Sequence, residues 1–122
     1  MRAEKATHFR FGRNARLRSG SDFRRVREQG SRLAQGCLIA NWLRLAEGSA
    51  SRLGVVTSAK VGGAVARNRT RRFLRECFRL HQHELGGPLD LVLVARPSIV
   101  GKSFAEVERE FLTTVRKARL LK

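Results

Sequence analysis

Acidic residues are scarce in this chain, and their scarcity excludes one class of catalyst. The 122 residues include 10 Asp and Glu against 26 Lys and Arg, and only Asp22 and Asp90 are aspartates. A nuclease that cleaves phosphodiesters with two divalent ions needs several clustered carboxylates. Glu106, Glu108 and Glu110 are close in sequence, but they fall in the first turns of a predicted helix, where acids complement the helix dipole. The sequence therefore predicts no two-metal site.

Histidine and cysteine are too few to build the other common hydrolytic or metal sites. A metal-independent ribonuclease brings two histidines and a lysine together, whereas His81 and His83 lie two apart at a helix end and would not face each other. Cys77 and His81 are spaced i,i+4, but two ligands do not close a metal site. No glycine-rich phosphate loop is present. Any catalytic group must therefore come from outside the chain.

Long apolar runs are absent as well. No run approaches the roughly 20 residues of a membrane span, and the N-terminal residues carry charge without an apolar segment, so neither a transmembrane helix nor a secretory signal is predicted. Cys37 and Cys77 are the only cysteines. We expect them to be reduced thiols in a cytoplasmic, single-domain protein.

Positive charge is what the chain has in excess. The net charge is +16 and the isoelectric point about 11.8. A charge of this size repels itself and is most naturally neutralised by a polyanion. Nucleic acid is the leading partner, and an anionic membrane surface is the other possibility.

Much of this charge lies in residues 60–80, which hold six arginines and one lysine against a single acid, Glu76. Gly62 and Gly63 interrupt the preceding strand, and the spacing predicts a helix from Ala64. At about 100° per residue, basic and apolar side chains separate onto two faces. The predicted packing face carries Ala66, Thr70, Phe73, Leu74, Cys77 and Leu80. The predicted solvent face carries Arg67, Asn68, Arg71, Arg72, Arg75 and Arg79, while Val65, Arg69 and Phe78 fit neither face.

A merely solvated arginine face is the plain alternative for this helix. Like charges at i,i+4, such as Arg67 and Arg71, repel by a few tenths of a kcal/mol, and a helix selected only for solubility would intersperse glutamates. The planar arginine fork also suits bidentate phosphate contacts. The pattern therefore favours a phosphate-binding face.

The rest of the chain reads as a basic arm followed by one domain. Residues 1–16 are expected to be a flexible arm, with Phe9 and Phe11 among its basic residues; it is either a disordered tail or a segment that orders on RNA. Residues 17–122 are expected to form a single RNA-binding α+β domain. Its predicted elements are a helix at 17–30 capped at Ser21 or Asp22, strands at 37–45, 52–58 and 90–95, a further short strand within 31–45, and a last helix opened by a Ser103–Glu106 capping box.

The segment GGAVARNRTRRFLRE at residues 62–76 resembles the signature of the bacterial ribonuclease P protein subunit. Nine positions match at fixed spacing: Gly62, Ala64, Val65, Arg67, Asn68, Arg71, Arg72, Arg75 and Glu76. Residues 17–30 resemble the family's first helix, and residues 52–62 resemble the strand that precedes its basic helix, with Ala59 in place of a lysine. The resemblance implies a single-domain α+β sandwich like the second domain of ribosomal protein S5. Its element order would be α-β-β-β-α-β-α, with the basic helix as a left-handed crossover.

The same resemblance implies a function and a set of site residues. The family's protein subunit is not itself catalytic: the RNA subunit and its Mg²⁺ ions remove the 5′ leader of precursor tRNA, and the protein binds both RNAs. No stable protein partner and no membrane is implied. The leader cleft would be bordered by Phe23, by Arg27 where the family usually has Phe, and by Asn41 where it often has Tyr. The catalytic RNA would be bound by Lys60, Arg67, Asn68, Arg69, Arg71, Arg72 and Arg75.

Two other functions are compatible with the charge. One is a ribosomal-type RNA-binding protein with no role in processing, which gives no reason for the nine-position spacing. The other is a membrane-surface or DNA-condensing protein, which would need large exposed apolar residues along one helix. Here the apolar residues are spread over several segments able to form one core, so the RNA-binding interpretation is preferred.

Overall fold

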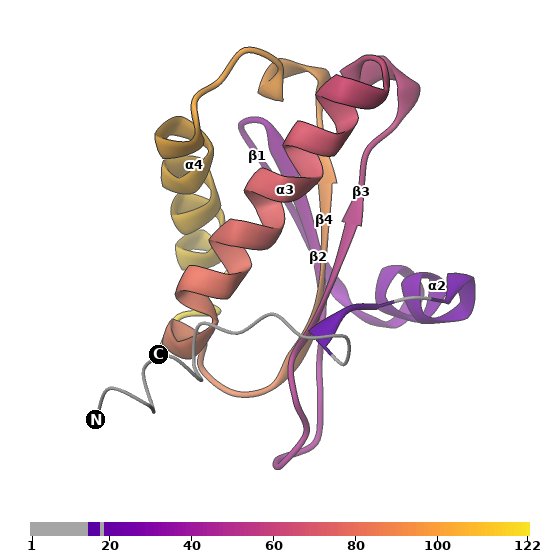
Figure 1. The fold of residues 1–122 in the computed structure, drawn as a ribbon. Coiled ribbons are helices and arrows are strands. Elements are labelled where there is room, and N and C mark those ends of the chain that lie inside the picture. The colour runs from indigo at the N-terminus through magenta and orange to yellow at the C-terminus, as the bar shows by residue number, and fades with distance from the viewer. Residues whose placement is uncertain (1–14, 18) are drawn as a thin grey trace.

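The computed structural model describes residues 15–17 and 19–122 (Figure 1). Residues 1–14, with Phe9 and Phe11, lie outside the described residues. The helices and strands follow the order α-β-β-β-α-β-α, which confirms the predicted fold class. They are α2 (Gly20–Gln29), β1 (Ser31–Gln35), β2 (Leu38–Arg44), β3 (Arg52–Val56), α3 (Ala64–His81), β4 (Leu89–Ala95) and α4 (Phe104–Lys117). Short 3-10 turns include η2 (Ala59–Val61) and η4 (Pro97–Ile99).

The four strands form one sheet in the order β1-β2-β4-β3. β1 with β2 and β2 with β4 are antiparallel, whereas β3 and β4 are parallel because α3 carries the chain back between them. This crossover is left-handed, as the resemblance implied, and Figure 1 shows α3 and α4 on one side of the sheet with α2 on the other. No helix among the described residues is long and apolar enough to cross a membrane.

Each face of the sheet has its own apolar cluster. The larger cluster lies under α3 and α4, where alternate residues of β4 such as Leu91 and Leu93 meet Phe78 and Phe111. The smaller cluster lies under α2 and joins Val92 to Val26 and Leu17. β4 therefore has buried residues on both faces, which suits its continuous apolar run.

The start of α2 differs from the prediction. The N-cap is Ser19, whose Oγ accepts a hydrogen bond from the Asp22 N–H at 3.1 Å, and not Ser21 or Asp22. Capping by Ser19 leaves the Asp22 carboxylate available for ion pairs described below. The predicted stop at Gly30 is confirmed, and a Cβ there would lie 2.1 Å from the Trp42 carbonyl oxygen, so the exit of α2 has room only for glycine.

The remaining element predictions hold with small shifts. The short extra strand expected within residues 31–45 is β1, and β2, β3 and β4 begin or end one or two residues from the predicted bounds. The capping box is present, because the Ser103 Oγ accepts from the Glu106 N–H and the Glu106 carboxylate accepts from the Ser103 N–H. Trp42 packs against the larger core.

Candidate nucleic-acid interface

The outer surface of α3 carries three exposed polar residues, Asn68, Arg69 and Arg72, which we call the basic ridge. The Arg69 guanidinium lies 4.5 Å from the centroid of the Phe73 ring, which fixes its direction by a cation–π contact. The Asn68 side chain is oriented by Arg71, which donates a hydrogen bond to its Oδ1 at 3.1 Å. Lys60 is also exposed and lies in η2, just before the helix. These side chains present donors to solvent at one end of α3.

The buried face of α3 is rotated from the sequence prediction. Phe78, which fitted neither face, is fully buried, and Arg67, predicted on the solvent face, is only half-exposed with its Nε buried and without a hydrogen-bond partner. The two-face pattern assumed one packing partner, whereas α3 contacts both the sheet and α4. The burial of Phe78 was therefore missed, and Arg67, like Arg71, Arg75 and Arg79, is only partly exposed on the predicted solvent face.

Three arginines from two segments crowd together along the outer edge of β3. Arg16 forms a parallel bridge to Leu53, and Arg71 donates to the Thr57 hydroxyl at 2.7 Å just beyond the strand. Burial, followed by repulsion from Arg16 and Arg71, lowers the pKa of the Arg75 guanidinium. We call Arg16, Arg71 and Arg75 the arginine cluster. Its mutual repulsion is what a bound polyanion would relieve.

Arg79, the last arginine of α3, differs from the others. It donates to the Glu76 carboxylate at 2.9 Å through Nε and at 2.5 Å through a terminal nitrogen. This pairing with Arg79 lowers the pKa of Glu76. The positive charge of Arg79 is thus matched locally by an acid one turn away, and the uncompensated charge lies nearer the start of the helix.

Three rows of residues cross the sheet on the side that α2 covers, and the strand register defines them. The row under α2 is Arg52, Asp90 and Leu43. The middle row is Gly54, Val92, Asn41 and Arg32. The last row, which we call the open row, is Val56, Val94, Ile39 and Ala34; each is at least partly exposed, so this end of the face forms an accessible apolar strip.

The three predicted leader-cleft residues take different positions along this face. The Phe23 ring is half-buried and lies against Gly54, where a Cβ would come within 2.6 Å of it. Arg27 is exposed one turn further along α2, on the same side of the helix as Phe23. Asn41 is only 8% exposed, at the centre of the middle row. Phe23 and Asn41 therefore lie beside the open row, with Arg27 at the rim.

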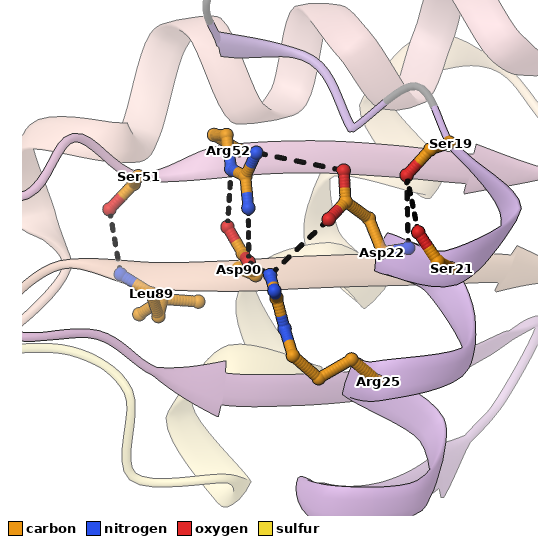
Figure 2. A network of polar contacts seen from close by, with 8 residues as sticks. All are labelled: Ser19, Ser21, Asp22, Arg25, Ser51, Arg52, Leu89 and Asp90. Atoms are coloured by element: carbon orange, nitrogen blue, oxygen red, sulfur yellow. Dashed lines mark hydrogen bonds and ion pairs between the residues drawn. The ribbon is translucent and has the colours of Figure 1, made fainter.

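A polar network fixes α2 over the sheet (Figure 2). Asp90 is fully buried and accepts from Arg52 at 2.9 and 2.8 Å and from Arg25 at 3.1 Å. Asp22 completes the network at longer range, 3.4 Å from Arg25 and 3.7 Å from Arg52. Two acids and two arginines from α2, β3 and β4 thus balance one another. Four charged groups placed this way orient α2, and with it Phe23, relative to the sheet.

The acids that could suggest catalysis in α4 have structural partners. Glu106 caps the helix, Glu108 lies 2.7 Å from His81, and Glu110 accepts from the Cys37 N–H at 2.7 Å. Within residues 15–17 and 19–122, no group of three or more His, Cys, Asp or Glu could hold a metal ion. Burial raises the pKa of both the Cys37 and Cys77 thiols to about 12, so neither is a ready nucleophile near neutral pH.

Comparison with known proteins assigns the chain to a family. The family model described as Ribonuclease P matches residues 11–119. The chain belongs to the ribonuclease P protein family.

The relatives within the ribonuclease P protein family cover most of this chain. The ribonuclease P protein component of Syntrophomonas wolfei is 37% identical over 108 residues, which span 88% of this chain and 90% of the relative. That of Desulfatibacillum aliphaticivorans is 42% identical over 88 residues, spanning 72% and 74%. These values agree with the match to the family model.

Solved ribonuclease P proteins share the fold. The Thermotoga maritima protein superposes with a TM-score of 0.72 at 28% identity, covering 80% of this chain and 92% of that one. The Staphylococcus aureus protein superposes with a TM-score of 0.82 at 24% identity, covering 88% and 98%. At this low identity the second likeness concerns the fold alone.

Sequence reasoning missed several residues that shape this ribonuclease P protein surface. Arg16 was assigned to the arm, yet it is bridged to β3 and adds charge to the arginine cluster. The hydrogen bonds from Arg25 and Arg52 to Asp90 were also missed, because Arg25 lies 65 positions and Arg52 lies 38 positions before Asp90 in the chain. The one local signal of this network was Asp90 itself, an isolated aspartate in an apolar strand. A carboxylate buried in such a strand needs a hydrogen-bonding partner.

Proposed function

We propose that this chain is the protein subunit of ribonuclease P. In this proposal it binds the catalytic RNA through α3 and the 5′ leader of precursor tRNA across the sheet, in the cytoplasm. It thereby assists the Mg²⁺-dependent endonucleolytic removal of the leader that gives the mature 5′ end. Family membership supports the role in tRNA processing. The phosphodiester is cleaved by the RNA subunit, and the chain itself is not catalytic.

The arginine cluster is the observation that carries this proposal. Arg16 is bridged to β3, Arg71 donates to Thr57 just beyond that strand, and burial followed by repulsion from Arg16 and Arg71 lowers the pKa of Arg75. Holding like charges together costs free energy in the unbound protein, and a phosphate backbone would recover it. With Lys60, Arg67, Asn68, Arg69 and Arg72, the cluster would form the contact surface for the catalytic RNA.

The sheet supports a second, distinct contact. The open row is apolar and partly exposed, and Phe23 borders it with a half-exposed ring. Single-stranded RNA is bound by stacking bases on aromatic side chains and by placing cations on its phosphates. Phe23 would supply the stacking surface, Arg27 a phosphate contact, and Asn41 a hydrogen bond to a base. The leader would then run along the open row.

Magnesium belongs on the RNA in this proposal. The described residues offer no cluster of three ligands for a divalent ion. What the protein contributes is positive charge that reduces the repulsion between two RNAs, so that fewer ions are needed for screening.

A cleavage assay at low Mg²⁺ tests the proposed function. Precursor tRNA is incubated with this chain alone, with a bacterial ribonuclease P RNA alone, and with both. We expect cleavage at the mature 5′ end only in the mixture. If the same RNA works with another bacterial protein subunit but not with this one, the proposal fails in favour of a ribosomal-type RNA-binding role. Cleavage by the chain alone would instead reveal an active site in the protein.

A further inference from the structure

An open groove runs beside the first half of α3, on the flank opposite the arginine cluster. It has a volume of about 540 Å³, within the roughly 300–1,000 Å³ typical of sites for small organic groups. One wall is α3 and the other is the turn that follows η4. The lining residues are Gly63, Ala64, Val65, Ala66, Arg69, Thr70, Phe73, Ile99, Val100 and Gly101.

Two exposed valines make this groove unusual for the surface of so charged a protein. Val65 is 83% exposed and Val100 is 54% exposed, one from each wall. Among the described residues the only other exposed large hydrophobic residue is Val56 on the open row, which is 37% exposed. The groove also has aromatic residues beside it, since Phe73 packs edge to face on Phe104 with ring centroids 5.5 Å apart. Apolar side chains gathered in a concave surface indicate a contact with another molecule.

The charges around the groove determine what that molecule can be. Arg69 lines the groove itself, and the exposed Asn68 and Arg72 lie next to it on the basic ridge. Lys60 lies in η2, which contacts η4. A second copy of this chain would bring another +16 of charge to a surface that is already positive. The occupant must therefore combine a flat apolar face with negative charge, as a nucleotide does.

We propose that the groove holds one unpaired nucleobase of the catalytic RNA. Val65 and Val100 contact the faces of the base from opposite walls, and Arg69 contacts the phosphate of the same nucleotide or of its neighbour. The inference rests on the proposed function, because it extends the α3 contact surface from phosphates to a base. It adds Val65 and Val100 to the residues that bind the RNA, through apolar contact and not through charge.

Serine substitutions at the two valines test the groove. Val65→Ser and Val100→Ser remove methyl groups at exposed positions, so the fold and net charge stay unchanged. The control is Ala46→Ser, a serine substitution at an exposed position of the β2–β3 loop, outside both proposed RNA surfaces. We expect the double variant to bind a bacterial ribonuclease P RNA about tenfold more weakly. The salt dependence of binding should be unaltered, and Ala46→Ser should leave affinity for this RNA at the wild-type value.

Chemical probing of the RNA separates a base contact from other effects. Dimethyl sulfate and a carbodiimide modify unpaired bases, and the wild-type protein should protect one such base that the double variant leaves reactive. Wild-type affinity in the double variant would overturn the inference, as would weaker binding with no base becoming reactive. If the wild-type protein neither binds nor activates the RNA, the proposed function itself has failed, and this outcome is seen before any variant is examined.

Discussion

At the scale of single residues, Asp90 shows how one buried acid organises a basic protein. It is the one buried charged residue among those the structure describes, and it accepts from both Arg52 and Arg25. Burial of a carboxylate is tolerated only where such partners replace water. Arg52 retains 30% exposure and Arg25 retains 39%, so the network reaches from the core to the surface beside α2.

Asp90→Asn should lower the free energy of unfolding by about 2–3 kcal/mol, because charge-assisted hydrogen bonds to two arginines are weakened at a buried position. Urea denaturation followed by circular dichroism measures this change. Asp22→Asn is the matched control: its contacts are 3.4 and 3.7 Å long and its side chain is 22% exposed. It should cost about 1 kcal/mol or less. Equal losses in the two variants would show that the network is not centred on Asp90.

His81 is the second residue with a measurable consequence. Its two ring nitrogens lie 2.6 Å from Glu84 and 2.7 Å from Glu108. Burial lowers the pKa of His81, but the hydrogen bonds to Glu108 and Glu84 outweigh it, and the net pKa is raised above 6.5. The protonated ring therefore stabilises the folded state, and this stabilisation is complete at pH values below the pKa that His81 has in the unfolded chain. This contribution is lost as pH rises through the folded pKa.

The free energy of unfolding should thus fall as the pH rises from about 6.5 through the raised pKa of His81. In His81→Gln this part of the pH dependence should disappear, whereas the neighbouring substitution His83→Gln should retain it. Urea titrations at a series of pH values provide the measurement. If the free energy of unfolding of His81→Gln changed with pH in the same way as that of the wild type, the His81 contacts would not be the source of the pH dependence.

At the scale of elements, α3 divides into parts that differ in charge and exposure. Its outer surface near the start carries the basic ridge, one flank carries Arg71 and Arg75, and the other borders the groove. Its far end carries the Arg79–Glu76 pair, which adds no net charge. The helix therefore presents its uncompensated charge over the turns nearest η2.

Replacing Arg72 and Arg75 together by Ala should weaken binding to the catalytic RNA at least about tenfold. The slope of log affinity against log salt should drop by roughly 1.5, because two phosphate contacts are lost. Stability should be retained, since removing Arg75 relieves repulsion from Arg16 and Arg71. Glu76→Gln with Arg79→Gln is the control, as it removes one charge of each sign from the same helix. If this neutral pair of substitutions weakened binding equally, local uncompensated charge would not be the cause.

At the scale of the whole molecule, the sheet separates two surfaces that share one edge. α3 and the arginine cluster lie on one side, the open row and α2 lie on the other, and β3 runs between them. A protein built this way can contact two RNA strands at once, with β3 as the boundary. The net charge of +16 then acts on both surfaces.

Affinity for the catalytic RNA should fall steeply with salt for the intact protein. Each phosphate contact contributes about 0.7 to 0.9 to the log–log slope, so the whole interface should give a slope of several units. Binding measured by fluorescence anisotropy over a range of KCl concentrations provides the value. A slope near zero would remove the electrostatic account of the interface.

Most of the elements and the family could be predicted from the sequence, because both depend on residues that are close together along the chain. Helix α3 begins at Ala64 as its spacing predicted, β4 follows its apolar run, and the nine-position signature identified the family. These features require only the periodicity of a helix or strand and the order of residues along the chain.

Which charged residues become neighbours follows only from the tertiary structure. Arg67 is half-buried because α3 packs on two partners at once, and a helical wheel represents only one. Arg25 and Arg52 are held by Asp90, whereas Arg16 lies beside Arg75. The energy of a charge depends on its neighbours within a few ångströms. Those neighbours are brought together by the packing of distant segments, which the spacing of residues along the chain does not specify.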